Sequence, residues 1–303
     1  MDFFQDESVI SGMVALVGPP NAGKSTLLNS LLKQKISIVT PKPQTTRNRI
    51  AGVLNEADYQ IVFLDTPGLH RAGSLLNREL VRIAMTSLKD VDAVVFLLDV
   101  STSLPVAKQA EKREEYLDYF KEINCPALLL LNKIDLVDRT KVLSLIATYS
   151  ELYPFKAIIP ISAKKGDGTQ RLVDELLTFL PKGHRYYPED VPTDASERFL
   201  AAEIIREKVF LLTGQEIPYS SAVMIDSFKE EAHRVTIHAT IYLERPSQKG
   251  IVIGKGGSKL KAIGIAARHD IEVLVDQKVV LKLWVKIRKN WSSDASFLKE
   301  LGF

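Results

Sequence analysis

The sequence predicts two domains: an α/β domain with a mostly parallel sheet and helices on both faces, then a smaller α+β domain. Three observations support this fold class. Short apolar runs alternate with helix-length amphipathic segments from residue 13 to 180. A proline-rich stretch without periodicity follows, and the rest of the chain reads as helix, strand, strand, helix, helix, strand. A length of 303 residues is sufficient for two domains.

Five apolar runs define the strands of the first domain, which we expect to span residues 1–180. Each is rich in leucine or β-branched residues and short enough for a strand, as expected in a parallel sheet buried on both faces. In chain order they are MVALVG (13–18), YQIVFLDT (59–66), VDAVVFLLDV (91–100), PALLLLNK (126–133) and AIIPISA (157–163).

Residues 181–196 are expected to form a linker, because they combine three prolines and a glycine with mixed charges. The second domain is expected to span 197–303. Its first helix should end near Gly214, which we predict as the C-cap. Two strand-like runs, a glycine loop, a helix from residue 258 and a final strand, VVLKLWVKIRK (279–289), follow.

Composition excludes several classes of protein. No apolar run approaches the roughly 18 residues of a membrane span, and the acidic start lacks the order of a signal peptide, so we expect a cytoplasmic protein. Cys125 is a lone cysteine to which we assign no chemistry, and the five histidines show no spacing typical of a transition-metal site.

Charge is unevenly distributed along the chain. Residues 1–180 carry 21 Lys and Arg against 21 Asp and Glu, whereas residues 245–303 carry 12 against 5, an excess of 12 − 5 = 7 positive charges. A basic segment favours nucleic acid as a partner only where a motif supports it.

The first glycine-rich loop matches the phosphate-binding pattern G-x-x-x-x-G-K-S and lies between a predicted strand and a predicted helix. Its backbone N–H groups would surround phosphate oxygens, Lys24 would reach the β- and γ-phosphates, and Ser25 would ligate Mg²⁺. The predicted nucleotide-binding residues of this loop are Gly18, Asn21, Ala22, Gly23, Lys24, Ser25 and Thr26.

Three further motifs follow predicted strands: one would contact Mg²⁺ and the γ-phosphate, and the other two would identify the base. In LDTPG, Asp65 would hold Mg²⁺ and the Gly68 N–H would face the γ-phosphate. In LLLLNKID, Asp135 would accept hydrogen bonds from guanine and the Lys133 stem would cover the ring, beside Asn132. In ISAKKG, the backbone of Ser162, Ala163 and Lys164 would contact the guanine oxygen. The motifs therefore predict a guanine nucleotide.

With these motifs the chain resembles the Era-like GTPases, of the translation-factor class, in which a Ras-like domain precedes a type II KH domain. PKPQTTRNRIAG (41–52) is similar to their switch I, where the magnesium-sensing threonine is Thr45 or Thr46; we favour Thr46. RFLAAEIIREKVF, IPYS, VIGKGGSKLKAIGIAAR and LKLWVK resemble the KH part, and the likeness covers nearly the whole chain.

This resemblance implies hydrolysis of GTP to GDP and phosphate, with Lys24, Thr46, Gly68 and Asn21 as catalytic residues and Ser25, Thr46 and Asp65 as metal ligands. It implies Mg²⁺, GTP and GDP as ligands, and K⁺ held partly by Asn21, although Asn21 bracing the loop is the alternative. It also implies a monomeric switch in small-subunit assembly that binds near the 3′ end of small-subunit ribosomal RNA, with the inner membrane surface as a second location.

The second glycine loop, GIVIGKGGSKL (250–260), fits neither a second phosphate loop nor a dinucleotide loop, because its glycine spacing fails both patterns. It contains G-x-x-G between predicted helices, the loop by which KH domains clamp about four nucleotides; a plain helix–helix turn is the alternative. The predicted RNA-binding residues are Gly254, Lys255, Gly256, Gly257, Lys259, Lys282 and Lys286.

Two other functions compete with this reading. A nucleotide-sensing adaptor at the membrane surface or in the cell cycle would use the basic face on anionic lipid, and a nucleotide kinase would leave N-K-x-D and S-A-K unexplained. Leu69 stands where related enzymes carry a water-orienting glutamine, so intrinsic turnover should be slow. We expect His70 to be an exposed switch residue rather than a general base.

Overall fold

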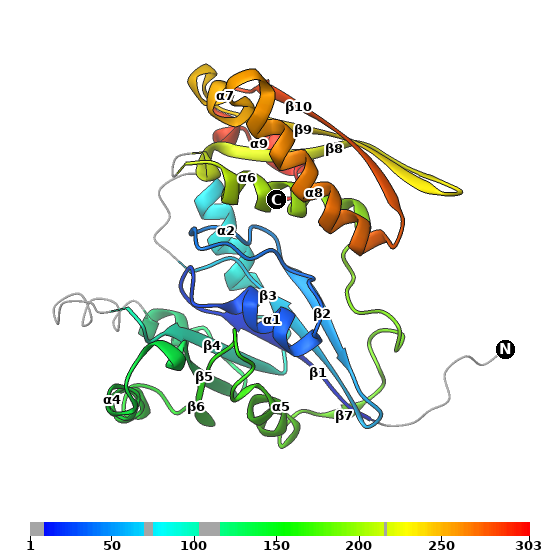
Figure 1. The fold of residues 1–303 in the computed structure, drawn as a ribbon. Coiled ribbons are helices and arrows are strands. Elements are labelled where there is room, and N and C mark those ends of the chain that lie inside the picture. Colours follow the sequence, from blue (N-terminus) through cyan, green and yellow to red (C-terminus); the bar gives the residue numbers. More distant parts are fainter. Residues whose placement is uncertain (1–8, 70–74, 103–115, 215–216) are drawn as a thin grey trace. The chain divides into compact units, whose positions relative to one another are not determined.

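The structure, a computed structural model, describes residues 9–69, 75–102, 116–214 and 217–303, which divide into two compact units (Figure 1). The first unit holds most of the chain up to Asp194, and the second holds residues 195–303. Residues 38–45 and the part of α2 (Leu75–Thr86) that ends at Leu80 also group with the second unit. His70 lies outside the described residues.

The first unit is built on a sheet with strand order β2-β3-β1-β4-β5-β6, in which β7 also pairs with β1. The β1–β3, β1–β4, β4–β5 and β5–β6 pairs are parallel, whereas β2 and β7 run antiparallel to their partners. The bounds are β1 (Val9–Val17), β2 (Ile50–Asn55), β3 (Tyr59–Asp65), β4 (Ala93–Asp99), β5 (Ala127–Asn132), β6 (Ala157–Ile161) and β7 (Lys182–Gly183).

Helices cover both faces of this sheet (Figure 1). Leucines of α1 and α5 pack with one face of the strands, and side chains of α2 and α4 pack with the other. Because the parallel strands end at the same edge, the loops after β1, β3, β5 and β6 lie together there. The helices are α1 (Lys24–Leu32), α2 (Leu75–Thr86), α4 (Arg139–Ser150) and α5 (Thr169–Leu177).

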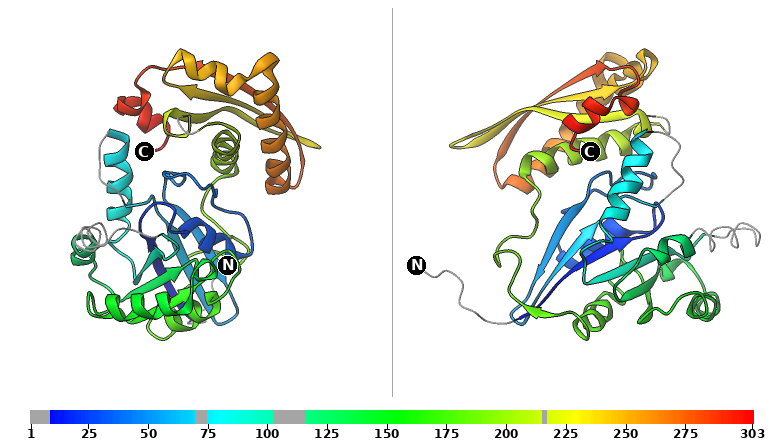
Figure 2. Two further views of the ribbon diagram at one scale, coloured as in Figure 1. Left: turned by 60° about the vertical axis from the view of Figure 1, so that its left-hand side comes forward. Right: turned by 180° about the vertical axis from the view of Figure 1, so that it is seen from behind.

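The second unit has a three-stranded sheet, order β10-β9-β8, in which β8 and β9 are antiparallel and β9 and β10 parallel. Helices α6, α7 and α8 pack on one face of this sheet, and α9 packs on the other beside Ala222 and Tyr242 (Figure 2). The elements are α6 (Glu197–Leu212), β8 (Ser221–Glu231), β9 (Arg234–Leu243), α7 (Pro246–Ile253), α8 (Ser258–Val275), β10 (Lys278–Ile287) and α9 (Ala295–Glu300).

The predicted fold class is therefore confirmed, including the order helix, strand, strand, helix, helix, strand in the second unit. Strands β2 and β7 and helix α9 were not predicted. Within the part of the chain that the structure describes, no helix is both long and apolar enough to cross a lipid bilayer.

Candidate functional site

The phosphate loop connects the end of β1 to the first residue of α1. Gly18 has φ 144°, and a Cβ there would lie 2.3 Å from the Leu97 carbonyl oxygen; Gly23 has φ 101°, and its Cβ would lie 2.2 Å from Asn132 Nδ2. Both positions therefore require glycine. Ala22 is buried, Asn21 has φ 60°, and the N-terminus of α1 opens into the loop. This arrangement directs backbone N–H groups toward an anion.

Lys24 lies across this loop. Its Nζ donates to the carbonyl oxygens of Gly18, at 3.0 Å, and Pro19, at 3.1 Å. Burial lowers the pKa of the Lys24 ammonium to about 8, while the nearby charge of Asp65 acts in the opposite direction. A buried ammonium whose described hydrogen bonds go to backbone carbonyl oxygens is suited to receive phosphate charge.

Asp65, at the end of β3, is the centre of a cluster of hydroxyl groups. Its Oδ2 accepts from Ser25 Oγ at 2.6 Å, Ser37 Oγ at 2.7 Å and Thr46 Oγ1 at 3.4 Å, and the Ser25 and Thr46 hydroxyls are 2.8 Å apart. All three predicted metal ligands thus lie together. Ser37 was not predicted, because it comes from a loop without a recognisable motif.

This cluster fits a hard divalent cation. Asp65 Oδ1 is buried and has no hydrogen-bond partner among the described residues. Burial raises the pKa of the Asp65 carboxyl, against the hydrogen bonds of Ser25, Ser37 and Thr46 and the charge of Lys24. Carboxylate and hydroxyl oxygens are ligands that Mg²⁺ prefers, and a cation would stabilise the ionised carboxylate.

Thr45 takes no part in this cluster. Its hydroxyl donates to the Lys42 carbonyl oxygen at 2.7 Å and lies 2.6 Å from the Thr40 hydroxyl. Of the two candidate threonines, Thr46 alone contacts Asp65 among the described contacts.

The segment after β3 closely approaches the phosphate loop. A Cβ on Gly68 would lie 2.7 Å from the Pro20 nitrogen, and the Leu69 N–H donates to the Gly18 carbonyl at 3.0 Å. Gly68 therefore requires glycine because of close contact rather than because of its φ. The Leu69 side chain is buried in the core beside β1 and β4.

Asn132, at the end of β5, links three loops. Its Nδ2 donates to the Ala22 carbonyl at 2.7 Å, and its Oδ1 accepts from the N–H groups of Lys133, at 2.8 Å, and Ala163, at 2.9 Å. The side chain is 2% exposed. Asn132 therefore holds the loops of the site together. We expect Lys133 and Asp135, which follow it, to contact the base.

Asp135 is oriented by Ser162. The Ser162 hydroxyl donates to Asp135 Oδ1 at 2.7 Å and is the largest cause of the lowered pKa of the Asp135 carboxyl. The carboxylate therefore stays ionised, as an acceptor of two guanine donors must be. Lys133 has φ 70°, and its ammonium forms an ion pair with Asp99 Oδ2 at 2.6 Å. Asp99 was not predicted, although its place at the end of β4 was a usable signal.

Two of the three N–H groups predicted for the guanine oxygen are already used within the protein. The Ser162 N–H donates to the Asp167 carbonyl at 3.0 Å and the Ala163 N–H to Asn132 Oδ1. Among the described contacts, the Lys164 N–H is the one of the three without such a partner.

The second glycine loop, between α7 and α8, has an open backbone. Gly254, Gly256 and Gly257 all have positive φ, of 73°, 59° and 80°. A Cβ on Gly254 would lie 2.9 Å from the Lys259 nitrogen, whereas a Cβ on Gly256 or Gly257 would meet no atom within 4 Å. A ligand could therefore approach this backbone, beside the exposed Lys255.

Lys282 and Lys286 do not belong to the same site as this loop. Val279 and Val285 of β10 are buried against the helices, so the alternating residues, including both lysines, point to the opposite face of the sheet. The structure thus separates the predicted RNA-binding residues into two groups.

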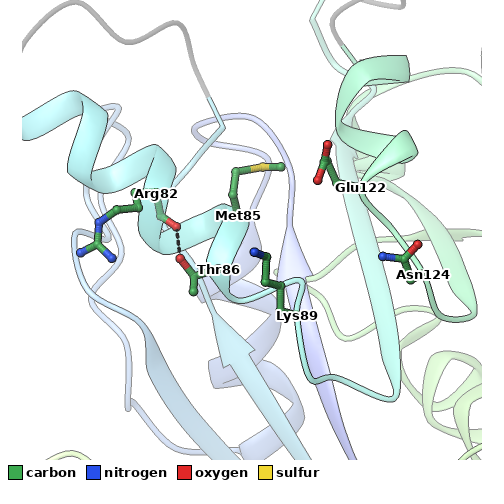
Figure 3. A pocket seen from close by; sticks show the side chains of 6 residues that line it. All are labelled: Arg82, Met85, Thr86, Lys89, Glu122 and Asn124. Atoms are coloured by element: carbon green, nitrogen blue, oxygen red, sulfur yellow. Dashed lines mark hydrogen bonds between the residues drawn. The ribbon is translucent and has the colours of Figure 1, made fainter.

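One further pocket, of about 270 Å³, lies in the first unit between the end of α2 and the segment before β5 (Figure 3). None of the predicted nucleotide-binding residues contributes to it. Its lining residues are Arg82, Met85, Thr86, Lys89, Glu122 and Asn124. In Figure 3 the Thr86 hydroxyl turns back to the Arg82 carbonyl, so this group is used within α2.

Comparisons with known proteins agree with both parts of the fold. A family described as 50S ribosome-binding GTPase matches residues 13–133, and a KH domain family matches residues 216–292. GTPase Era of Geobacter metallireducens is 50% identical over 300 residues, covering 98% of this chain and 99% of the relative. GTPase Era of Staphylococcus haemolyticus is 44% identical over 295 residues, covering 97% of each.

Two solved structures match nearly the whole chain at 39% identity, each covering 97% of this chain and 99% of the other. They are a variant of Aquifex aeolicus Era bound to GDP and AlF₄⁻, with a TM-score of 0.91, and Era in complex with MgGDPNP and nucleotides 1506–1542 of 16S ribosomal RNA, with a TM-score of 0.92. With relatives near 50% identity over almost its full length, this chain belongs to the Era family of GTPases.

Proposed function

We propose that this GTPase is a guanine-nucleotide switch that binds small-subunit ribosomal RNA near its 3′ end during subunit assembly. The observation that carries the proposal is the pairing, in one chain, of the Asp65 cluster at the phosphate loop with an open G-x-x-G backbone. The Era relative in complex with 16S ribosomal RNA supports the choice of RNA.

The base and phosphates would be held by the loops at the carboxyl edge of the sheet. Asp135 would accept from guanine, with Lys133 along the ring and Lys164 donating to the guanine oxygen. Lys24, the loop backbone from Gly18 to Thr26, and the Gly68 N–H would surround the phosphates. Fixed donors of this kind stabilise the charge that moves between phosphate oxygens in the transition state.

Ser25, Thr46 and Asp65 would hold Mg²⁺, which supplies charge neutralisation at the β- and γ-phosphates when bound. The Ser25 and Thr46 hydroxyls lie within hydrogen-bond distance of each other and of Asp65, so the three oxygen groups are close enough to hold one ion. Asn21 would help to hold K⁺ near the phosphates, where the ion would supply positive charge in place of an arginine finger. Release of Thr46 after hydrolysis would then free the segment around it.

Residues 197–303 would form the RNA-binding domain, joined to the GTPase domain 1–180 by the linker 181–196. The RNA backbone would run against Gly256 and Gly257, with Lys255 and Lys259 beside it. Location in the cytoplasm, a monomeric state and association with the inner membrane surface stay predictions.

A double substitution, Lys255→Asp with Gly256→Asp, tests the RNA site. RNA affinity should fall at least tenfold, about 1.4 kcal/mol, because two negative side chains would stand where phosphates should lie. The measurement is fluorescence anisotropy with a short pyrimidine-rich RNA across a salt series, where the parent slope should be near −0.7 per phosphate neutralised.

Guanine-nucleotide binding on the same preparation is the control, since none of its residues is changed. Equal RNA affinity and salt slope in parent and variant would show that this loop is only a turn. Failure of the parent to bind the RNA at all would refute the proposed RNA-binding function.

A further inference from the structure

The face of the C-terminal sheet opposite α6, α7 and α8 carries a row of lysines around one tryptophan. Alternate residues of β10 pack into the core with the helices, so the residues between them point outward. A model Cβ on Gly264 of α8 would meet Leu283 at 3.6 Å, which fixes the side that faces the helices. The outward residues are Lys278, Val280, Lys282, Trp284 and Lys286. We call them the β10 outer row.

Trp284 is unusual because 43% of it is exposed. The other tryptophan, Trp291, is fully buried, and its Nε1 donates to the Ser220 carbonyl at 3.0 Å. Trp291 thus has a packing role, whereas the exposed Trp284 ring is available to a ligand. The Trp284 ring meets His238 of β9 edge-on, with centroids 5.3 Å apart and an interplanar angle of 63°. This contact holds the indole on the sheet surface while part of the ring stays accessible.

The outward residues of β9, next to the β10 outer row, show which part of this sheet face is accessible. At one end, Tyr242 of β9 packs against Phe297 of α9, with centroids 5.0 Å apart, while Lys286, its partner on β10, stays exposed. At the other end the register places Thr236 and His238 beside Val280 and Lys282. The open area is thus a strip along β10 and β9 rather than the whole sheet.

The net charge on this strip is positive. Of the two nearby carboxylates, Glu231 pairs with Arg234 at 2.7 Å, whereas Asp226 accepts from the neutral Thr240 Oγ1 at 2.7 Å and keeps one negative charge against the three lysines. Within the described residues, the three lysines of the β10 outer row form no ion pair. They are spaced four residues apart, about 13 Å at the rise of a strand.

We propose that the β10 outer row is a second RNA-binding surface, on which a base of single-stranded RNA stacks on Trp284 while Lys282 and Lys286 hold the flanking phosphates. The inference rests on the proposed RNA-binding function. An exposed aromatic ring between cations on a sheet is the arrangement by which proteins bind single strands without reading their sequence. The G-x-x-G loop clamps only about four nucleotides, so a longer RNA would continue onto another surface.

An RNA strand fits this row better than a lipid surface. Insertion into a bilayer needs a broad apolar face, whereas the β10 outer row offers one indole and Val280 between three charges. One aromatic ring between two lysines matches one base between two phosphates.

The test compares two RNAs by fluorescence anisotropy: one of about six pyrimidine nucleotides, enough for the loop alone, and one of about 20, long enough for both surfaces. Trp284→Ala, and separately Lys282→Glu with Lys286→Glu, should weaken binding of the longer RNA at least fivefold and leave the shorter unchanged. Trp284→Phe, which keeps an aromatic ring, should stay within twofold of the parent. Lys33→Glu with Lys156→Glu, two exposed changes in the first unit, is the control with the same change of net charge.

A direct readout comes from the indole itself. Because Trp291 is buried, quenching of tryptophan fluorescence by acrylamide reports mainly on Trp284, and the longer RNA should protect it severalfold more than the shorter.

Three outcomes would overturn the proposal. The first is that Trp284→Ala binds the longer RNA as tightly as the parent, whereas Lys255→Asp with Gly256→Asp no longer binds this RNA. This result would leave the proposed function intact. The second is equal losses for both RNAs. The third is that the variants of the β10 outer row bind RNA like the parent but no longer sediment with vesicles of anionic phospholipid. This result would assign the strip to lipid binding. A parent protein that binds neither RNA would instead refute the proposed function itself.

Discussion

Asn132 Nδ2 donates a hydrogen bond to the carbonyl oxygen of Ala22 over 2.7 Å, and so ties the end of β5 to the phosphate loop. Asn132→Ala would leave this oxygen and the Ala163 N–H without their partner in a buried site, at a cost of about 1–3 kcal/mol each. We expect affinity for GDP and GTP to fall by tenfold or more, and the nucleotide-free protein to unfold at a lower temperature. Fluorescent-nucleotide titration and thermal unfolding measure the two effects. Asn124→Ala, at an exposed asparagine, should change neither.

Asp135→Asn should change which base is bound. An amide offers a donor where guanine also offers donors, so GTP should bind at least tenfold more weakly, about 1.4 kcal/mol, and xanthosine triphosphate should bind better than in the parent. Ser162→Ala is the matched control: it removes the hydroxyl that orients Asp135 and should weaken GTP without any gain for xanthosine. Competition binding with both nucleotides decides this. Unchanged GTP affinity in Asp135→Asn would contradict the assignment.

Substitutions of Thr46 and Thr45 distinguish a role in metal binding from a role in loop structure. Thr46 contacts Ser25 and Asp65, whereas Thr45 contacts Thr40 and Lys42. Thr46→Ala should slow Mg²⁺-dependent GTP hydrolysis at least tenfold and leave GDP affinity nearly unchanged, because it removes a ligand that matters with a γ-phosphate present. Thr45→Ala should keep more than half of the activity. The reverse order of the two variants in a single-turnover assay would assign the metal-sensing role to Thr45.

Nucleotide binding should depend on pH through Lys24. Burial lowers its pKa from the ordinary value of 10.5 to about 8, and phosphate would raise it again. Between pH 8 and 10.5 the unfolded chain therefore holds more protons at this group than the free folded protein, so its contribution to the free energy of unfolding rises with pH. In the same window GDP should bind more weakly as pH rises and take up a proton.

Titration calorimetry at pH 8.5 in two buffers with different ionisation enthalpies would measure the proton uptake. Lys24→Gln should bind weakly and show no uptake. A parent protein that binds GDP without proton uptake would show that the ammonium is already charged in the free site.

Turnover should be slow and should depend on potassium. Leu69 is buried in the core and cannot orient water, and K⁺ would supply the positive charge that an arginine finger supplies in related enzymes. If Asn21 helps to hold K⁺, hydrolysis in potassium chloride should be severalfold faster than in the same concentration of sodium chloride, and Asn21→Ala should remove the difference. Should the parent hydrolyse GTP equally fast in both salts, Asn21 has only the bracing role.

The parallel strands of the first unit could be predicted because each is a continuous apolar run buried on both faces. Strand β2 escaped prediction because its six residues, IAGVLN, are interrupted by Gly52. That glycine is set by tertiary packing, since a Cβ there would lie 2.5 Å from Leu28 of α1. A contact between residues distant in the sequence, such as Gly52 and Leu28, cannot be predicted from a local sequence pattern.

The predicted C-cap at Gly214 was wrong. Helix α6 ends at Leu212, and Thr213 follows with an extended φ of −116°. The carbonyl oxygens at this end are taken by the Lys42 ammonium, which donates to Thr213 at 2.8 Å and also to Phe210. A cap supplied from 171 positions away along the chain cannot be read from the helix's own sequence.

The nucleotide motifs could be read because strand ends in a parallel sheet must meet at one edge. The sequence did not predict which contact each of these residues makes. Asn132 turned out to join loops, Ser162 contributes its hydroxyl to Asp135, and Ser37 shares Asp65 with Ser25. Each depends on side-chain directions that the spacing of motifs does not specify.

Among the strands that the structure describes, β10 is the last in its sheet, so its outer edge could pair with the edge strand of another molecule. Lysines on an edge strand oppose such pairing, so Lys278, Lys282 and Lys286 would also keep the protein from aggregating. Replacing them with alanine would remove this protection around an exposed tryptophan, and the variant would self-associate at the concentrations used for titration. Glutamate reverses the charge seen by a ligand but still repels a second copy of the strand, which makes it the safer substitution at this edge.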